Sequence, residues 1–88
     1  MNLSNVEVCD KVNAMFVDLF ELESDKLIPE AHLYTDLSLD SLDAIDLVIS
    51  FERVFKIKPP HEEIRNIQTL GDVHQLVLKY YTDENQVN

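Results

Sequence analysis

The sequence predicts an all-α protein: a small bundle of three main helices plus one short helix, with a long loop between the first two helices. Apolar residues recur at helical spacing in three long segments, and no segment alternates apolar and polar residues for long enough to predict a strand. The chain has 88 residues, of which 45% are hydrophobic and 27% charged. This is enough apolar material for one packed core, and too short a chain for two.

The first predicted helix begins near Ser4 or Asn5, either of which can cap it, and continues to about Phe20. Its apolar residues share one face: Val8, Val12, Met15, Phe16, Leu19 and Phe20. Residues 22–39 show no sustained period and contain Pro29, so a long ordered loop is expected next. Five apolar residues of this loop are expected to hold it against the core: Leu27, Ile28, Leu33, Tyr34 and Leu37.

The second predicted helix runs from Ser41 to about Phe55, with Asp40 as its N-cap, and it ends before a pair of prolines. A short third helix is expected over residues 60–65, because a proline near its start and acids in its first turn favour a helix N-terminus. Thr69 then caps a last helix that continues to about Tyr80. We assign residues 1–82 to one domain and residues 83–88 to a frayed tail.

Two apolar faces distinguish the second predicted helix. One is an arc about 120° wide that is expected to face the core: Ala44, Leu47, Val48, Phe51, Val54 and Phe55. The other is a stripe of Leu42, Ile45 and Ile49, and its borders carry charges: Asp46, Glu52 and Arg53. Because a helix needs only one buried stripe, this second stripe indicates a docking face for a basic partner. The alternative is that Ile45 packs under the loop and that Leu42 and Ile49 are ordinary exposed residues.

Charge and composition exclude several classes of function. Seven Lys and Arg against seventeen Asp and Glu give a formal net charge of −10, so nucleic acid and anionic membranes are poor partners. No apolar run approaches the roughly 20 residues that span a bilayer. The polar, acidic N-terminus is unlike a secretory signal, so a soluble, cytoplasmic protein is expected.

Neither a metal site nor a self-contained catalytic site is predicted. Cys9 is the only cysteine. The three histidines lack the spacing of metal ligands: His32, His61 and His74. The segment that starts at Asp36 has the alternating oxygen ligands of a calcium loop, but Ser41 stands where that loop needs Gly and Leu47 where it needs Glu. No nucleophile elbow or glycine-rich phosphate loop is present, so we predict no catalytic residues.

Ser41 has a setting that suits a phosphodiester. It is expected in the first turn of a helix, next to Asp40 and close to Asp43. The free N–H groups and partial positive charge of a helix N-terminus tolerate a phosphate ester. The alternative is that Ser41 is an ordinary first residue of a helix.

The segment around Ser41 resembles the acyl carrier protein family. Residues 36–48 read D-L-S-L-D-S-L-D-A-I-D-L-V, similar to the family signature D-L-G-x-D-S-L-D-x-x-E-L-V. The similarity continues from about Asp10 to Tyr80 at these positions: Val12, Met15, Phe16, Phe20, Phe55, Pro60, His61, Glu62, Glu63, Ile67 and Thr69.

The resemblance implies a free-standing, type II carrier that is not an enzyme and is a monomer when free. A phosphopantetheinyl transferase would move 4′-phosphopantetheine from coenzyme A onto Ser41, which Asp40 and Leu42 flank. The thiol of this arm would hold acyl groups as thioesters at a high effective concentration for each partner enzyme. The implied partners have basic docking patches, and they include a ketosynthase and an acyltransferase or acyl ligase. The implied docking residues are Asp40, Leu42, Asp43, Asp46, Ile49, Glu52, Arg53 and Ile67.

Three features depart from the family pattern. Ser38 stands where Gly is usual, so the loop must avoid a positive φ or accept strain. Arg53 replaces a usual acid, and Pro59 with His61 replace an apolar residue and an acid. These departures favour a dedicated carrier with fewer partners, serving fatty-acid, polyketide or related specialised synthesis. The absence of a Gly-Gly-x-Ser element disfavours a peptidyl carrier.

The alternative function is that of a small acidic helical adaptor without a prosthetic group. Such a protein would bind basic protein surfaces through Leu42, Asp46 and Ile49. Replacing Ser41 by Ala separates the two functions, because a carrier would lose its function with its fold intact while an adaptor would keep its binding.

Overall fold

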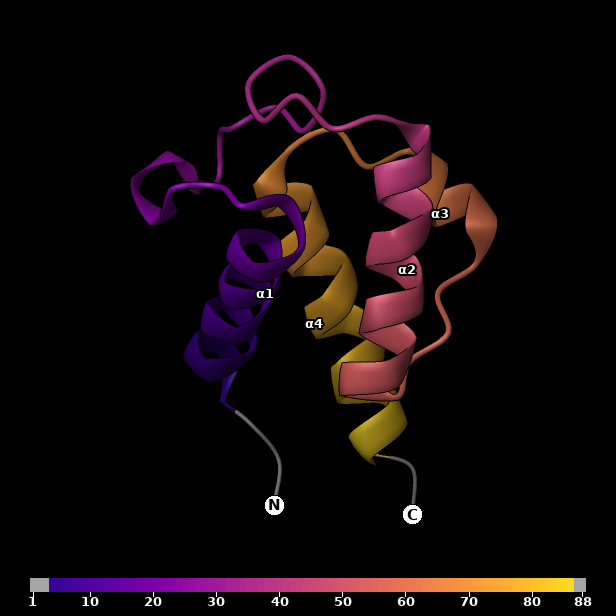
Figure 1. Cartoon of the computed structure of the whole chain (residues 1–88). Helices are drawn as coiled ribbons and strands as arrows, with labels where there is room; N and C mark the ends of the chain where they lie inside the picture. Colours follow the sequence, from indigo (N-terminus) through magenta and orange to yellow (C-terminus); the bar gives the residue numbers. More distant parts are fainter. Residues whose placement is uncertain (1–3, 87–88) are drawn as a thin grey trace.

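The computed structural model describes residues 4–86, without the side chains of His61 and of residues 82–86 (Figure 1). The elements follow one another as α1 (Asn5–Phe20), the 3-10 helix η1 (Ser24–Lys26), α2 (Ser41–Phe55), α3 (His61–Arg65) and α4 (Leu70–Gln86). Over residues 4–86 there is no strand, and extended backbone pairs only at an isolated bridge between His32 and Thr69. The predicted all-α class, with three long helices and one short one, is confirmed.

The three long helices form the body of the bundle. α4 packs against both α1 and α2, and the loop between η1 and α2 crosses one end of the bundle (Figure 1). α3 is a single short turn beside α2, in the segment that leads from α2 to α4. This arrangement leaves the outer face of α2 uncovered by the other long helices.

Side-chain caps fix where the first and last long helices begin. Ser4 Oγ accepts the N–H of Glu7, and the Glu7 carboxylate accepts the N–H of Ser4, which is a reciprocal capping box. At the start of α4, the Asp72 carboxylate accepts the N–H of Thr69, and Thr69 Oγ1 accepts the N–H of Asp72. The predicted caps at Ser4 and Thr69 are therefore confirmed.

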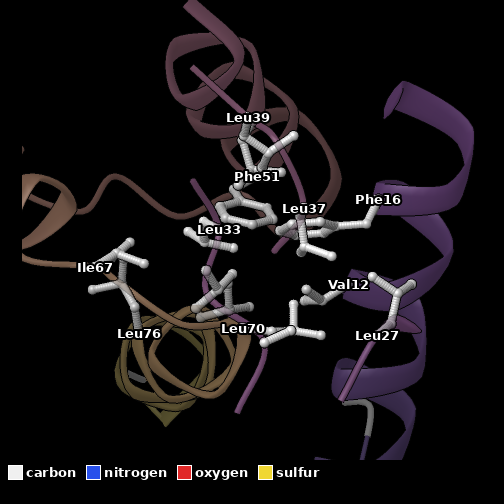
Figure 2. Close-up of a cluster of buried hydrophobic side chains, with 14 of the residues drawn as sticks. Val12, Phe16, Leu27, Leu33, Leu37, Leu39, Phe51, Ile67, Leu70 and Leu76 are labelled. Carbon is white, nitrogen blue, oxygen red and sulfur yellow. The ribbon is translucent and has the colours of Figure 1, made fainter. Parts of the chain in front are cut away.

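The core is a continuous cluster of aliphatic and aromatic side chains from α1, α2, α4 and the long loop (Figure 2). Phe16 of α1 and Phe51 of α2 are the largest of its fully buried members. Three predicted loop residues, Leu27, Leu33 and Leu37, are buried in this cluster. The same prediction is wrong for Ile28 and Tyr34, which are 50% and 42% exposed. An irregular loop has no period that decides which apolar side chains face inward.

Backbone hydrogen bonds attach the long loop to the start of α4. Leu33 donates its N–H to the Gln68 carbonyl at 2.8 Å, and Leu70 donates to the Ala31 carbonyl at 2.9 Å. Gly71 donates to the Pro29 carbonyl at 2.9 Å, and a Cβ atom at Gly71 would lie only 3.1 Å from that same oxygen. The only glycine of the chain therefore stands where a close approach of the loop leaves little space for a side chain.

Two boundaries differ from the sequence prediction. The turn η1 interrupts the segment that was predicted as a loop without helix. α4 continues to Gln86 and does not end near Tyr80, because a polar stretch without Pro or Gly can extend an existing helix. The predicted tail, residues 83–88, overlaps this last turn and then lies outside the described residues.

Candidate functional site

Ser41 is the first residue of α2, and its side chain is exposed. The residues around it form a reciprocal cap: Asp40 Oδ1 accepts the N–H of Asp43 at 2.9 Å, and Asp43 Oδ2 accepts the N–H of Asp40 at 3.0 Å. The predicted helix start, with Asp40 as N-cap, is confirmed. The cap fixes the direction in which α2 leaves the loop, and it places the Ser41 hydroxyl at the tip of a rigid element.

The first turn of α2 keeps donors free beside Ser41. Asp43 and Ala44 have acceptors for their N–H groups, the side chain and the carbonyl of Asp40. Within residues 4–86, neither the N–H groups of Ser41 and Leu42 nor the Ser41 hydroxyl take part in a hydrogen bond. A phosphodiester on Ser41 would meet these two donors and the positive end of the helix dipole. The residues present therefore fit a phosphate ester at this position.

The backbone just before α2 accepts conformational strain at Ser38. Its φ is 59°, in the left-handed region that glycine adopts at lower cost. Leu37 and Leu39 on either side are buried, and Leu39 donates its N–H to the Leu33 carbonyl at 3.0 Å. Burial of both neighbours holds the chain in this conformation. Of the two alternatives predicted for Ser38, avoiding a positive φ or accepting strain, the structure adopts the second.

His32 organises the same loop, a role that our sequence reasoning missed. Its Nδ1 accepts the N–H groups of Tyr34 and Thr35 at 3.2 and 3.3 Å. Its own N–H donates to the Asp36 carboxylate at 2.8 Å. These contacts assign the proton of a neutral His32 ring to Nε2. The available signal was a His–Asp pair four residues apart within an aperiodic, turn-rich segment.

A groove of about 390 Å³ opens beside Ser41 and runs along α2. Its walls come from three parts of the chain: Tyr34 of the loop, Ser41, Ala44, Ile45, Val48, Ile49 and Glu52 of α2, and Ile64 and Arg65 of α3. The lining is mainly apolar, with Glu52 and Arg65 as its charged members. The sequence did not predict this groove, because its third wall depends on where the short α3 lies.

The second apolar stripe of α2 is open to solvent. Leu42, Ile45 and Ile49 are 70%, 55% and 49% exposed, so Ile45 does not pack under the loop. Asp46, Glu52 and Arg53 beside the stripe are also exposed. This is the arrangement that the docking-face interpretation requires.

The structure places two apolar residues differently from what the sequence predicts. Val54, predicted in the core arc, is 38% exposed, whereas Leu47, Phe51 and Phe55 are buried; Val54 lies at the edge of the arc, where packing ends. Ile67, an implied docking residue, is only 8% exposed and belongs to the core (Figure 2). The turn between α3 and α4 directs its side chain inward, so its implied docking role stays a prediction.

A polar cluster ties α3 to α4. The Glu63 carboxylate accepts hydrogen bonds from the Tyr80 hydroxyl and from Lys79 Nζ, the latter at 2.9 Å. These two donors lower the pKa of Glu63, the Tyr80 hydroxyl most strongly. The cluster attaches α3 to α4.

The remaining sequence expectations concern metals and membranes. Among the described residues, no group of three or more His, Cys, Asp or Glu side chains is placed to hold a metal ion. Cys9 is half-buried, and burial raises the pKa of its thiol, with a smaller contribution from Asp10. Within residues 4–86, the helices are too short or too polar to cross a membrane.

Residues 10–77 match the sequence family described as a phosphopantetheine attachment site. An acyl carrier protein of Akkermansia muciniphila is 39% identical over 71 residues, covering 81% of this chain and 89% of that one. Acyl carrier protein 2 of Ralstonia nicotianae is 36% identical over 73 residues, covering 81% and 88%. Among solved structures, a candidate acyl carrier protein of Mycobacterium tuberculosis superposes with a TM-score of 0.78 at 26% identity, covering 83% of this chain and 97% of that one. The acyl carrier protein of Enterococcus faecalis, at 23% identity and a TM-score of 0.75, shares the fold and covers 89% and 99% of the two chains.

Proposed function

Because the chain belongs to the acyl carrier protein family, whose members are carriers and hold 4′-phosphopantetheine covalently, we propose that Ser41 is its attachment residue. The observation that supports this most directly is the exposed Ser41 hydroxyl at the N-terminus of a capped helix, with the N–H groups of Ser41 and Leu42 free beside it. Ser41 also occupies the serine position of the signature over residues 36–48.

The proposed attachment is a phosphoryl transfer at Ser41 Oγ. A phosphopantetheinyl transferase removes the hydroxyl proton, Oγ forms a new bond to the phosphorus that bears the pantetheine arm, and adenosine 3′,5′-bisphosphate leaves from coenzyme A. When bound, the arm supplies a thiol that forms thioesters with acyl groups. The chain itself supplies a fixed point of attachment, because the Asp40–Asp43 cap holds the first turn in one orientation.

The docking face proposed for partner enzymes surrounds this attachment point. Leu42 lies next to Ser41, and Ile49 continues the exposed stripe along α2. Asp46 and Glu52 supply negative charge on either side of the stripe. A partner with Lys and Arg around its active-site opening would be attracted by these acids and would bury the apolar side chains on contact.

The proposed cargo consists of acyl intermediates of fatty-acid, polyketide or related specialised biosynthesis. A ketosynthase and an acyltransferase or acyl ligase are the enzymes that would load and elongate such cargo, besides the transferase that installs the arm. The proposal places the protein in the cytoplasm, one compartment in which coenzyme A is available as the donor. The similarity to acyl carrier proteins over more than four-fifths of the chain supports a carrier, and the departure at Arg53 supports a dedicated one.

Intact-mass spectrometry tests the proposal. The chain is incubated with coenzyme A, magnesium and a broad-specificity phosphopantetheinyl transferase, beside its Ser41→Ala and Ser38→Ala variants. We expect the wild type and Ser38→Ala to gain the mass of one phosphopantetheine and Ser41→Ala to gain none. Modification of Ser41→Ala, or no modification of a folded wild-type chain while a control carrier is loaded, would contradict the assignment. Circular dichroism of all three proteins confirms that they are folded.

A further inference from the structure

The exposed face of α2 changes the sign of its charge along the helix. Asp43 and Asp46 lie in its first two turns, whereas Arg53 lies in its last turn and Lys56 caps its end. Of the seven Lys and Arg residues in the chain, three occur between positions 53 and 58: Arg53, Lys56 and Lys58. All three are exposed. The docking helix therefore begins acidic, and at its far end three cations stand against the single acid Glu52.

Arg53 shares its side of the helix with the docking residues. At 100° per residue, its direction lies about 20° from that of Leu42 and about 20° from that of Asp46 around the helix axis. The opposite side is closed to partners, since Leu47 and Phe51 are buried there. Asp46 and Arg53 are seven positions apart in the chain, which is about 10 Å along the axis. One flat partner surface can therefore meet both charges.

The charge of Arg53 is not compensated within the described part of the chain. The one ion pair found there joins Glu63 to Lys79. The residues three and four positions from Arg53 are Ile49, Ser50, Lys56 and Ile57, none of which is acidic. Glu52, next to it in sequence, points about 100° away around the helix axis, so it borders the opposite edge of the docking stripe. A partner cation placed opposite Arg53 would meet repulsion, and a carboxylate would meet attraction.

We propose that the enzymes which dock on this face carry a two-signed surface, an inference that rests on the carrier function proposed above. Cations beside the active-site opening meet Asp43 and Asp46. A carboxylate about 10 Å further along the surface meets Arg53 and Lys56. A partner whose docking patch is wholly basic is disfavoured at Arg53, so the same residue attracts one class of partner and rejects another.

Charge reversal on both proteins tests this inference. The probe is a broad-specificity phosphopantetheinyl transferase, first unmodified and then with each cation of its carrier-docking patch changed in turn to Glu. The chains compared are wild type, Arg53→Glu and Lys26→Glu. Lys26 is exposed in η1, away from α2, so its reversal changes the net charge equally without changing the docking face. Binding is measured in a Ser41→Ala background, and transfer to Ser41 is measured separately.

With the unmodified transferase at low salt, we expect Arg53→Glu to bind about tenfold more tightly than wild type and to be modified with a kcat/KM about tenfold higher. Lys26→Glu should change either quantity less than about twofold, because it is far from the docking face. One of the Glu-substituted transferases should reverse the preference and bind the wild type more tightly than Arg53→Glu. The variant Arg53→Gln should bind the unmodified transferase with an affinity between those of the wild type and Arg53→Glu.

Equal effects of Arg53→Glu and Lys26→Glu would overturn the inference, because net charge alone would then explain the binding. The inference would also fall if no Glu-substituted transferase reversed the preference. Arg53 in the last turn also interacts favourably with the helix dipole. Thermal unfolding of each variant therefore measures any change in stability separately from binding. Failure of the carrier function is distinct: a folded wild-type chain would take up no phosphopantetheine at any transferase concentration, and both proposals would fail.

Discussion

Asp40 and Asp43 each accept the backbone N–H of the other, at 2.9 and 3.0 Å, across the first turn of α2. Both residues are also proposed docking acids, so one oxygen of each carboxylate is already used to hold the helix start. A substitution at either position would therefore change two properties together, the cap of α2 and the charge beside Ser41. Variants that separate cap from charge are needed to interpret any loss of partner binding.

Asp40→Ala is expected to lower the free energy of unfolding by about 1 kcal/mol, because the N–H of Asp43 loses its acceptor. Asp40→Asn keeps an acceptor oxygen and is expected to lose only a small part of that stability while removing the charge. Urea unfolding of both variants and the wild type measures the difference. If Asp40→Ala had the same unfolding midpoint and slope as the wild type, the cap would have no energetic role.

Ser38→Gly is expected to stabilise the protein by roughly 0.5–1 kcal/mol. The φ of 59° at Ser38 strains a residue with a Cβ atom, and relief of that strain outweighs the extra freedom that glycine gives the unfolded chain. Ser38→Ala is the matched control, since it removes the hydroxyl and keeps the Cβ. Thermal unfolding should rank Ser38→Gly above Ser38→Ala and the wild type. The opposite order would mean that the loop relaxes at little cost.

The sequence predicted the start of every long helix because local capping chemistry determines it. Ser4, Asp40 and Thr69 each have a side-chain oxygen three residues before the N–H that they bind, so a short window of sequence contains the whole interaction. The end of α4 was placed too early because a polar helix end has no comparable signal. The exposed stripe of α2 and the position of Ser41 were predictable because both depend only on residues within a short stretch of sequence.

Features that depend on tertiary contacts were not predictable. Ile67 was assigned to the docking face, but the path of the chain between α3 and α4 turns it into the core. Tyr34 was assigned to the core, but it forms a wall of the groove beside Ser41. In each case, the three-dimensional arrangement of the chain determines what the residue contacts. The spacing of residues along the chain does not reveal that arrangement.

Acid is expected to weaken the fold through His74. Burial lowers the pKa of His74, while Asp10 raises it by a smaller amount, and Nε2 lies 2.8 Å from Asn13 Oδ1 between α4 and α1. A histidine with a lowered folded-state pKa contributes its full stability above the ordinary value of about 6.5 and loses it as pH falls below that value. Urea unfolding should therefore show a decrease in stability from pH 7.5 to pH 5.5.

His74→Gln is the control for this pH dependence. Glutamine can donate to Asn13 but does not titrate, so its loss of stability over the same pH range should be smaller. The carboxylates of Glu63 and Asp72, whose pKa values are lowered by their hydrogen-bond donors, lose their contributions only at lower pH. An equal pH slope in the wild type and in His74→Gln would assign the effect to other groups.

Salt is expected to raise the melting temperature. The formal net charge of −10 on 88 residues gives a folded state with strong self-repulsion, which dissolved ions screen. Increasing sodium chloride from about 20 to about 200 mM shortens the screening length from roughly 20 Å to below 10 Å. Differential scanning calorimetry should show a rise of a few degrees. An unchanged or lower melting temperature would mean that favourable charge pairs balance the repulsion.

Substitutions at Ile49 and Ile67 are expected to have different effects: loss of Ile67 lowers stability, whereas loss of Ile49 weakens docking. Ile67 is 8% exposed in the core, so Ile67→Ala should cost about 2–4 kcal/mol of unfolding free energy through lost packing and a cavity. Ile49 is 49% exposed, so Ile49→Ala should cost less than about 0.5–1 kcal/mol. A phosphopantetheinyl transferase, in contrast, should modify Ile49→Ala with a several-fold lower kcat/KM, because a central apolar contact of the docking face is gone.

The milder variants Ile49→Val and Ile67→Val control for side-chain volume. Each removes one methylene group, so the stability loss should be about 1 kcal/mol at Ile67 and close to zero at Ile49. Transfer rates are measured below the unfolding temperature of the weakest variant, so that every chain is folded during the assay. If Ile49→Ala were modified as fast as the wild type, the exposed stripe of α2 would not contact the transferase. If Ile67→Ala were fully stable yet modified slowly, Ile67 would act in docking after all.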